Sequence, residues 1–209
     1  MKLFYLLFFN FLISFIAIGQ DCKKLDYKSF FRSIKFGDSI PPDLIACSKK
    51  TKVANGYSVL RIQYDSLDKS CKKKYADLFT FLSTPFSFSQ ISTNNNGQVL
   101  VVELYSFFND DRSDKALIYD PSPNFIKISK KLESLFGKPT TIKEPTKTDS
   151  LFLREKGMPV EMFWTCNTIE LQLRGYYGAS KKDLNVLHIQ IRNREFDLVQ
   201  ELQVPTDQN

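Results

Sequence analysis

The N-terminus constrains this chain more than any other feature, because a long apolar run there ends shortly before a cysteine. Residues 3–18 are apolar except for two polar residues, and a lysine precedes them. Ala17 and Gly19 match the small residues that a secretory cleavage site requires. The run is shorter than the roughly 20 apolar residues that span a bilayer. We therefore expect residues 1–19 to be a signal peptide and residues 20–209 to be one exported domain. An uncleaved N-terminal anchor is the alternative.

Cys22 lies just beyond the expected cleavage site, where lipid attachment has to be considered. Bacterial lipidation requires small residues before the cysteine, whereas Gln20 and acidic Asp21 stand there. A lipoprotein is therefore not expected. The sequence predicts a periplasmic or extracellular protein without a membrane span once the signal peptide is removed.

The four cysteines, Cys22, Cys47, Cys71 and Cys166, are an even number, which favours two disulfides in an oxidising compartment. None lies in a C-x-x-C pair, and no two have the close spacing of zinc ligands. Three pairings are open. We prefer Cys71–Cys166 with Cys22–Cys47, because Cys71 falls on an apolar helical stripe and Cys166 on an apolar strand face. Buried free thiols are the alternative.

The charge pattern argues against nucleic acid as a partner. The chain has 29 Lys+Arg and 23 Asp+Glu, a net charge of +6, and its lysines form short groups among acidic residues. Such groups are typical of solvated surfaces, and a patch for anionic polymers is the alternative. No Arg-rich or aromatic-interleaved motif of a nucleic-acid-binding module is present.

Apolar periodicity and turn residues predict an α+β fold, with an antiparallel sheet and about three to four helices packed mainly on one face. Helices are expected over 25–36, 41–48, 66–83 and 122–136. Strands are expected over 57–65, 98–108, 149–155, 160–166, 169–177 and 184–193.

Two features bear on the organisation of the expected domain. The Ser/Thr/Asn-rich residues 84–97 predict a loop and a candidate sub-boundary, with an edge strand as the alternative. The pairs Phe36-Gly37 and Phe136-Gly137 each mark the end of an expected helix, with a proline soon after. They raise the hypothesis of two diverged copies of one helix–sheet unit.

No pattern predicts catalysis, and we assign no catalytic residue, metal ligand or cofactor. The only histidine, His188, is expected to be exposed on a strand face opposite Leu187, Ile189 and Ile191. Glu161 and Glu170 are expected near each other across a hairpin. The Asp-rich residues 109–114 lack the glycine and glutamate of a calcium-binding EF-hand loop.

Four aromatic residues are the candidate ligand-binding residues, because they flank Ser- or Gly-rich loops: Phe86, Phe88, Tyr176 and Tyr177. Packing of the loops onto the sheet is the alternative role. We therefore expect an exported, non-catalytic protein that binds a protein, peptide or glycan at the cell envelope. The alternatives are an exported hydrolase with an acid/Tyr site that has no readable motif, and a structural or assembly factor of the envelope.

Overall fold

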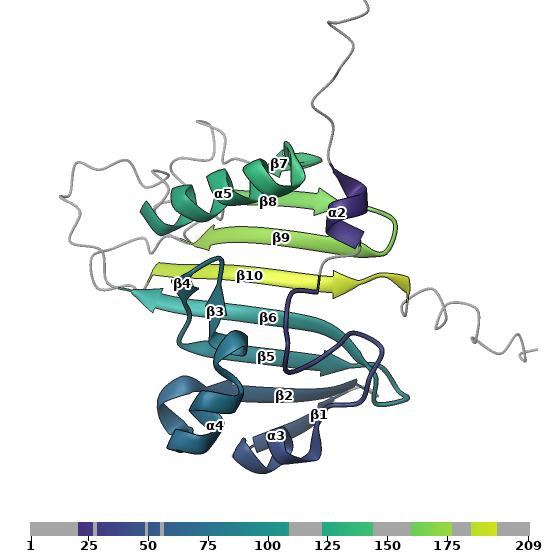
Figure 1. Cartoon of the computed structure of the whole chain (residues 1–209), viewed down its shortest axis with the longest axis vertical. Coiled ribbons are helices and arrows are strands. Elements are labelled where there is room, and N and C mark those ends of the chain that lie inside the picture. Colours follow the sequence, from purple (N-terminus) through teal and green to yellow (C-terminus); the bar gives the residue numbers. More distant parts are fainter. Residues whose placement is uncertain are drawn as a thin grey trace, which may run out of the picture.

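An antiparallel sheet dominates the structure. This computed structural model describes residues 21–26, 29–48, 50–54, 57–108, 123–143, 160–176 and 185–195 of the 209 residues. Eight strands form one sheet in the order β1-β2-β5-β6-β10-β9-β8-β7, and β3 pairs with β4 separately (Figure 1). The strands are β1 (Lys50–Ala54), β2 (Tyr57–Gln63), β3 (Thr80–Phe81), β4 (Thr84–Pro85), β5 (Phe88–Thr93), β6 (Val99–Phe108), β7 (Thr141–Lys143), β8 (Val160–Thr165), β9 (Ile169–Tyr176) and β10 (Asn185–Asn193).

The described helices are few and mostly short. They are the α-helices α2 (Cys22–Asp26), α3 (Pro42–Cys47), α4 (Lys69–Lys74) and α5 (Pro123–Phe136), with the 3₁₀ turns η1 (Tyr64–Ser66) and η2 (Ala76–Phe79). All four α-helices lie on the same side of the large sheet (Figure 1). The α+β expectation is therefore wrong, since the fold is rich in β-structure and only α5 exceeds six residues.

Two expected helices account for this error. Of the expected helix over 25–36, α2 ends at Asp26 and residues 29–36 have no regular structure, while residues 66–83 break up after α4 into η2 and β3. Because Gly37 does not end a helix, the expected repeat of a helix followed by Phe-Gly is absent, and the hypothesis of two copies is wrong as well. Gly37 and Gly137 nevertheless share a left-handed backbone, with φ of 84° and 79°. Glycine adopts this conformation without steric cost.

Alternation of side chains along the strands gives the sheet one apolar face. In β10, for example, Leu187, Ile189 and Ile191 are at most 1% exposed and point to the core. Their neighbours across the register include Leu173 and Leu104, which are also fully buried. This face carries the hydrophobic core of the domain, because consecutive strand residues point to opposite sides.

Helix α5 covers part of this core and forms as the sequence predicts. Its buried residues recur on one face: Phe125, Ile128, Ser129, Leu132 and Phe136. Gly137 follows the helix and donates its N–H to the carbonyl of Glu133 at 2.9 Å. The indole Nε1 of Trp164 on β8 donates to the carbonyl of Gly137 at 2.9 Å, which fixes the helix end against the sheet.

Residues 29–40, which we name the strap, run across the core face without regular structure. Long-range partners satisfy the backbone: the Asp77 carboxylate accepts from the N–H groups of Arg32 and Ser33 at 2.6 and 3.0 Å. Gly37 donates to the carbonyl of Val99 at 3.0 Å. These bonds replace those of the expected helix, because a backbone donor away from water requires a partner.

Residues 88–93 form a strand in the interior of the sheet, so the expected loop over 84–97 is wrong. β5 lies between β2 and β6, and its exposure alternates along all six residues. Ser89, Ile91 and Thr93 are buried on the core face. The polar composition suggested a loop because two of the three core positions are occupied by hydroxyl residues.

All four cysteines are paired, but the preferred pairing is wrong. The disulfides are Cys22–Cys166 and Cys47–Cys71, with Cα–Cα distances of 5.3 and 6.2 Å. The core positions predicted for Cys71 and Cys166 are correct, since both are buried. They lie in different parts of the core, however, and each is bridged to a short helix, α3 or α2. Two disulfides agree with an oxidising environment and an exported protein.

Candidate functional site

The second face of the sheet carries a cluster of polar and aromatic side chains. Register places Glu103 of β6 between Gln90 and Gln190, and Tyr105 between Phe88 and His188. Alternation then puts Phe107 on the same face. We name this group the open-face cluster, because none of the described α-helices covers it (Figure 1). Its members are Phe88, Gln90, Glu103, Tyr105, Phe107 and His188.

Glu103 is the centre of the cluster. Its carboxylate accepts a hydrogen bond from the Tyr105 hydroxyl at 3.1 Å and another from the amide of Gln90. The Nε2 atom of His188 lies 3.2 Å from the same carboxylate. Burial alone would raise the pKa of Glu103, but the interaction with His188 and the bonds from Tyr105 and Gln90 outweigh it and lower the pKa. Glu103 is therefore an ionised acceptor at neutral pH.

His188 is buried, which corrects the expectation of an exposed strand histidine. Only 3% of the residue is exposed. Its ring stacks on that of Tyr105, with centroids 4.3 Å apart and planes 7° from parallel. Alternation predicted the correct face, but not that a cross-strand tyrosine would cover the imidazole.

An imidazole beside a carboxylate is also the arrangement of a general base and its orienting acid. Catalysis would further require a nucleophile or a water molecule within reach of the imidazole. In the part of the chain that the structure describes, the closest ring to His188 is that of Tyr105, and its carboxylate neighbour is Glu103. The contacts of His188 are therefore with Glu103 and Tyr105, and they hold the Glu103 carboxylate in position.

The aromatic members lie at the end of the cluster nearest the C-terminus of β6. Phe88 meets Tyr105 edge-on, with centroids 5.7 Å apart, and Tyr105 is nearly parallel to Phe107 at 6.4 Å. Phe107 is 49% exposed. The cluster therefore presents one accessible aromatic face beside a row of hydrogen-bonding groups.

Polar side chains continue across β9 and β8. Arg174 Nε lies 2.7 Å from Glu161 Oε1, and the two residues are directly opposite in the register. Glu170 faces Thr165 instead, four register positions from the Glu161–Arg174 pair, so the expected proximity of Glu161 and Glu170 is wrong. Because four is an even number, both residues remain on one face, but the cation Arg174 is the neighbour of Glu161.

Only part of the sequence-predicted ligand site comes together. Phe88 belongs to the open-face cluster, whereas Phe86 is 4% exposed and packs in the core. The backbone of Tyr176 is opposite Val186, which is in turn opposite Phe107. Tyr177 lies outside the described residues, as does the expected signal peptide. Loop composition therefore identified one residue of the cluster, Phe88.

The sequence analysis missed Gln90, Glu103, Tyr105 and Phe107. The last three occur at every second position of the 98–108 run, which appeared uniformly apolar because the opposite face holds valine and leucine. Strict period-two counting along this run would have found them.

The described residues contain no group of three or more His, Cys, Asp or Glu side chains placed to hold a metal ion. Among the same residues, no helix has the length and apolarity needed to cross a membrane. Comparison of the chain with known protein families, curated proteins and solved structures found no match.

Proposed function

We propose that this protein is an exported, non-catalytic binding protein of the periplasm or extracellular space, and that its ligand site is the open-face cluster. The observation that carries the proposal is the exposed ring of Phe107, which stacks on Tyr105, the residue whose hydroxyl donates to the ionised Glu103. An accessible aromatic face next to fixed hydrogen-bond acceptors and donors is a common composition of binding sites.

The chemistry of the cluster favours a glycan. Gln90 accepts from Arg61 Nε at 2.9 Å and donates to Glu103, which leaves one amide N–H and one oxygen lone pair for a ligand, while the Phe107 ring supplies an apolar face. These groups match a ligand that presents hydroxyls at its edges and C–H groups on its faces. A sheet face is also rigid, so little conformational entropy is lost on binding.

A glycan array with disulfide-bonded protein lacking residues 1–19 tests this proposal. We expect saturable binding to at least one envelope glycan, and roughly fivefold weaker binding by Phe107→Ala, because aromatic contacts contribute on the order of 1 kcal/mol. The matched control is Leu135→Ala, which truncates a residue of α5 that is 39% exposed. It should bind like the wild type. Absence of glycan binding, or equal binding by Phe107→Ala, would contradict the proposal.

A second candidate is an exported hydrolase in which His188 acts as a general base oriented by Glu103. The 3.2 Å separation of their side chains favours this function. It predicts turnover of an ester or glycoside that is lost in both His188→Gln and Glu103→Gln. Binding without product release, measured by mass spectrometry of the incubated ligand, would instead support the non-catalytic proposal.

A further inference from the structure

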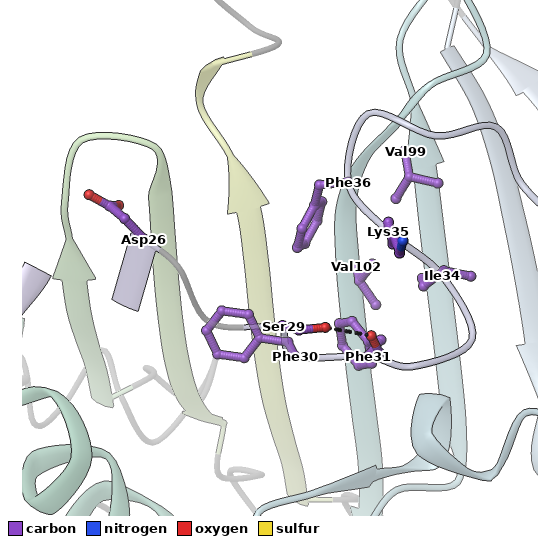
Figure 2. Close-up of a pocket in the computed structure, with 9 residues that line it drawn as sticks. All are labelled: Asp26, Ser29, Phe30, Phe31, Ile34, Lys35, Phe36, Val99 and Val102. Atoms are coloured by element: carbon purple, nitrogen blue, oxygen red, sulfur yellow. Dashed lines mark hydrogen bonds between the residues drawn. The ribbon is translucent and has the colours of Figure 1, made fainter. Parts of the chain in front are cut away.

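A cavity lies on the other side of β6, between the strap and the sheet (Figure 2). Its volume is about 370 Å³. Four buried apolar residues form its inner wall: Phe31 and Ile34 from the strap, and Val99 and Val102 from β6. Because Val102 and Glu103 are consecutive in a strand, the cavity and the open-face cluster lie on opposite faces of the sheet.

Two partly buried aromatic residues of the strap complete the apolar lining. Phe30 and Phe36 lie at separate points of the strap, and both lie to the left of Val102 in the view (Figure 2). Phe30 is held in place by ring contacts with Phe81 and Phe136, each with centroids 6.2 Å apart. The cavity thus has fixed apolar walls on several sides, which favours a ligand with an apolar body.

The charged residues that line the cavity determine whether it favours an anionic or a cationic ligand. Asp26 contributes to the lining, but its carboxylate turns toward the β8–β9 connection (Figure 2). There it accepts from the Thr168 N–H and hydroxyl, both at 3.0 Å, and from the Ile169 N–H at 3.1 Å. Burial would raise the pKa of Asp26, but these hydrogen bonds outweigh it and lower the pKa.

Lys35 is the cation of this lining, and it is exposed. Neither an ion pair nor a side-chain hydrogen bond engages its ammonium group among the described residues. Ser29 is exposed as well, but its hydroxyl already donates to the carbonyl of Phe31 at 3.0 Å. The rim therefore offers one positive charge above an apolar interior.

The volume limits the size of the apolar body. An engineered cavity of about 150 Å³ accepts benzene, which has six carbon atoms. In proportion, a volume of about 370 Å³ accommodates about fifteen non-hydrogen atoms. A saturated chain of about twelve carbons with a small head group has this size.

We propose that this cavity binds an amphipathic small molecule, consisting of an apolar body and one anionic head group that pairs with Lys35. Carboxylate and phosphate heads share this chemistry. The site is independent of the glycan proposed for the opposite face.

Isothermal titration of the disulfide-bonded protein with three twelve-carbon probes, each below its micelle concentration, tests the proposal. The probes are dodecanoate, dodecyl phosphate and dodecyltrimethylammonium. We expect one molecule of an anionic probe to bind per chain, and weaker binding of the cation by about two- to fivefold, since it lacks the exposed ion pair. The stronger of the two anionic probes identifies the head group. If neither anion binds, or if the cation binds equally well, the proposal is overturned.

Two variants locate the site. Lys35→Glu should weaken dodecanoate binding at least fivefold and favour the cation, whereas Lys73→Glu, which reverses an exposed lysine of α4 outside the cavity, should bind like the wild type. Val102→Phe should abolish binding by filling the cavity, provided that its near-UV circular dichroism is native. Phe107→Ala should leave dodecanoate binding unchanged, because Phe107 lies on the opposite face of the sheet. The titration therefore tests the cavity separately from the glycan proposal. Equal dodecanoate affinity of the Lys35 and Lys73 variants would refute the role of Lys35 in binding.

Discussion

Removing the two disulfides separately should destabilise the protein by different amounts. Cys22 and Cys166 are 144 residues apart, and Cys47 and Cys71 are 24 apart. In the chain-entropy model, a loop of the first length is worth about 5 kcal/mol of unfolding free energy and one of the second about 3.4 kcal/mol. We therefore expect Cys22→Ala/Cys166→Ala to lose about 1.5 kcal/mol more stability than Cys47→Ala/Cys71→Ala.

Differences in packing should nearly cancel in this comparison. Each pair contains one buried cysteine, 6% or 7% exposed, and one partly buried cysteine. The alanine variants consequently lose similar side-chain contacts, and the difference in loop length is the main term that remains. The shorter loop is nested inside the longer one, which lowers both expected losses equally, by about 0.15 kcal/mol, and leaves their difference unchanged.

Urea unfolding followed by the fluorescence of the single tryptophan provides the assay, with free energies from linear extrapolation. Non-reducing peptide mapping of the wild type should recover the Cys22–Cys166 and Cys47–Cys71 peptides. Equal losses in the two variants, or a larger loss for Cys47→Ala/Cys71→Ala, would refute the entropic argument. Recovery of Cys71–Cys166 peptides would refute the pairing itself.

Three further predictions concern single side chains. Trp164→Phe should cost about 2–4 kcal/mol, because it leaves the Gly137 carbonyl without its indole donor and opens space in the core; thermal unfolding measures this loss. Asp26→Asn should destabilise the protein by about 1–3 kcal/mol near pH 7 by weakening the bonds at Thr168. The pKa of Asp26 is lowered in the folded state, so its contribution is present above its ordinary value of about 3.8 and is lost as pH falls through the lowered value. The pKa of Glu103 is also lowered in the folded state, so its contribution to stability is likewise lost as the pH falls. The urea midpoint of Glu103→Gln should therefore fall less steeply with acidification than that of the wild type. An equal dependence of the two midpoints on pH would contradict the lowered pKa.

Sequence reasoning succeeded where the determinants of structure are local. The proline at the start of α5, its apolar stripe and the glycine after it all lie within one fifteen-residue stretch. The β8–β9 hairpin and β10 were predicted correctly because their alternation is strict. In each case propensity, periodicity and the terminating residue indicate the same element.

It failed where distant partners decide the conformation. The strap has the apolar spacing of a helix, yet Asp77 captures the backbone donors of Arg32 and Ser33, which are 45 and 44 residues away. The open-face cluster likewise depends on strand order, since Glu103 and His188 become neighbours only when β10 pairs with β6. The prediction that the helix and strand cysteines pair with each other failed for a similar reason, because burial alone does not specify which buried groups are adjacent.

The Cys22–Cys166 disulfide has a consequence for how the chain would respond to a stretching force. A pull from the N-terminal end reaches Cys22 before any described strand, and the covalent bond to Cys166 carries the load past β1 to β8. Of the described strands, β9 and β10 alone lie on the loaded path between Cys166 and the C-terminal end. The bridge thus makes most of the sheet inextensible, and reduction would release more than a hundred residues to lengthen under the same force.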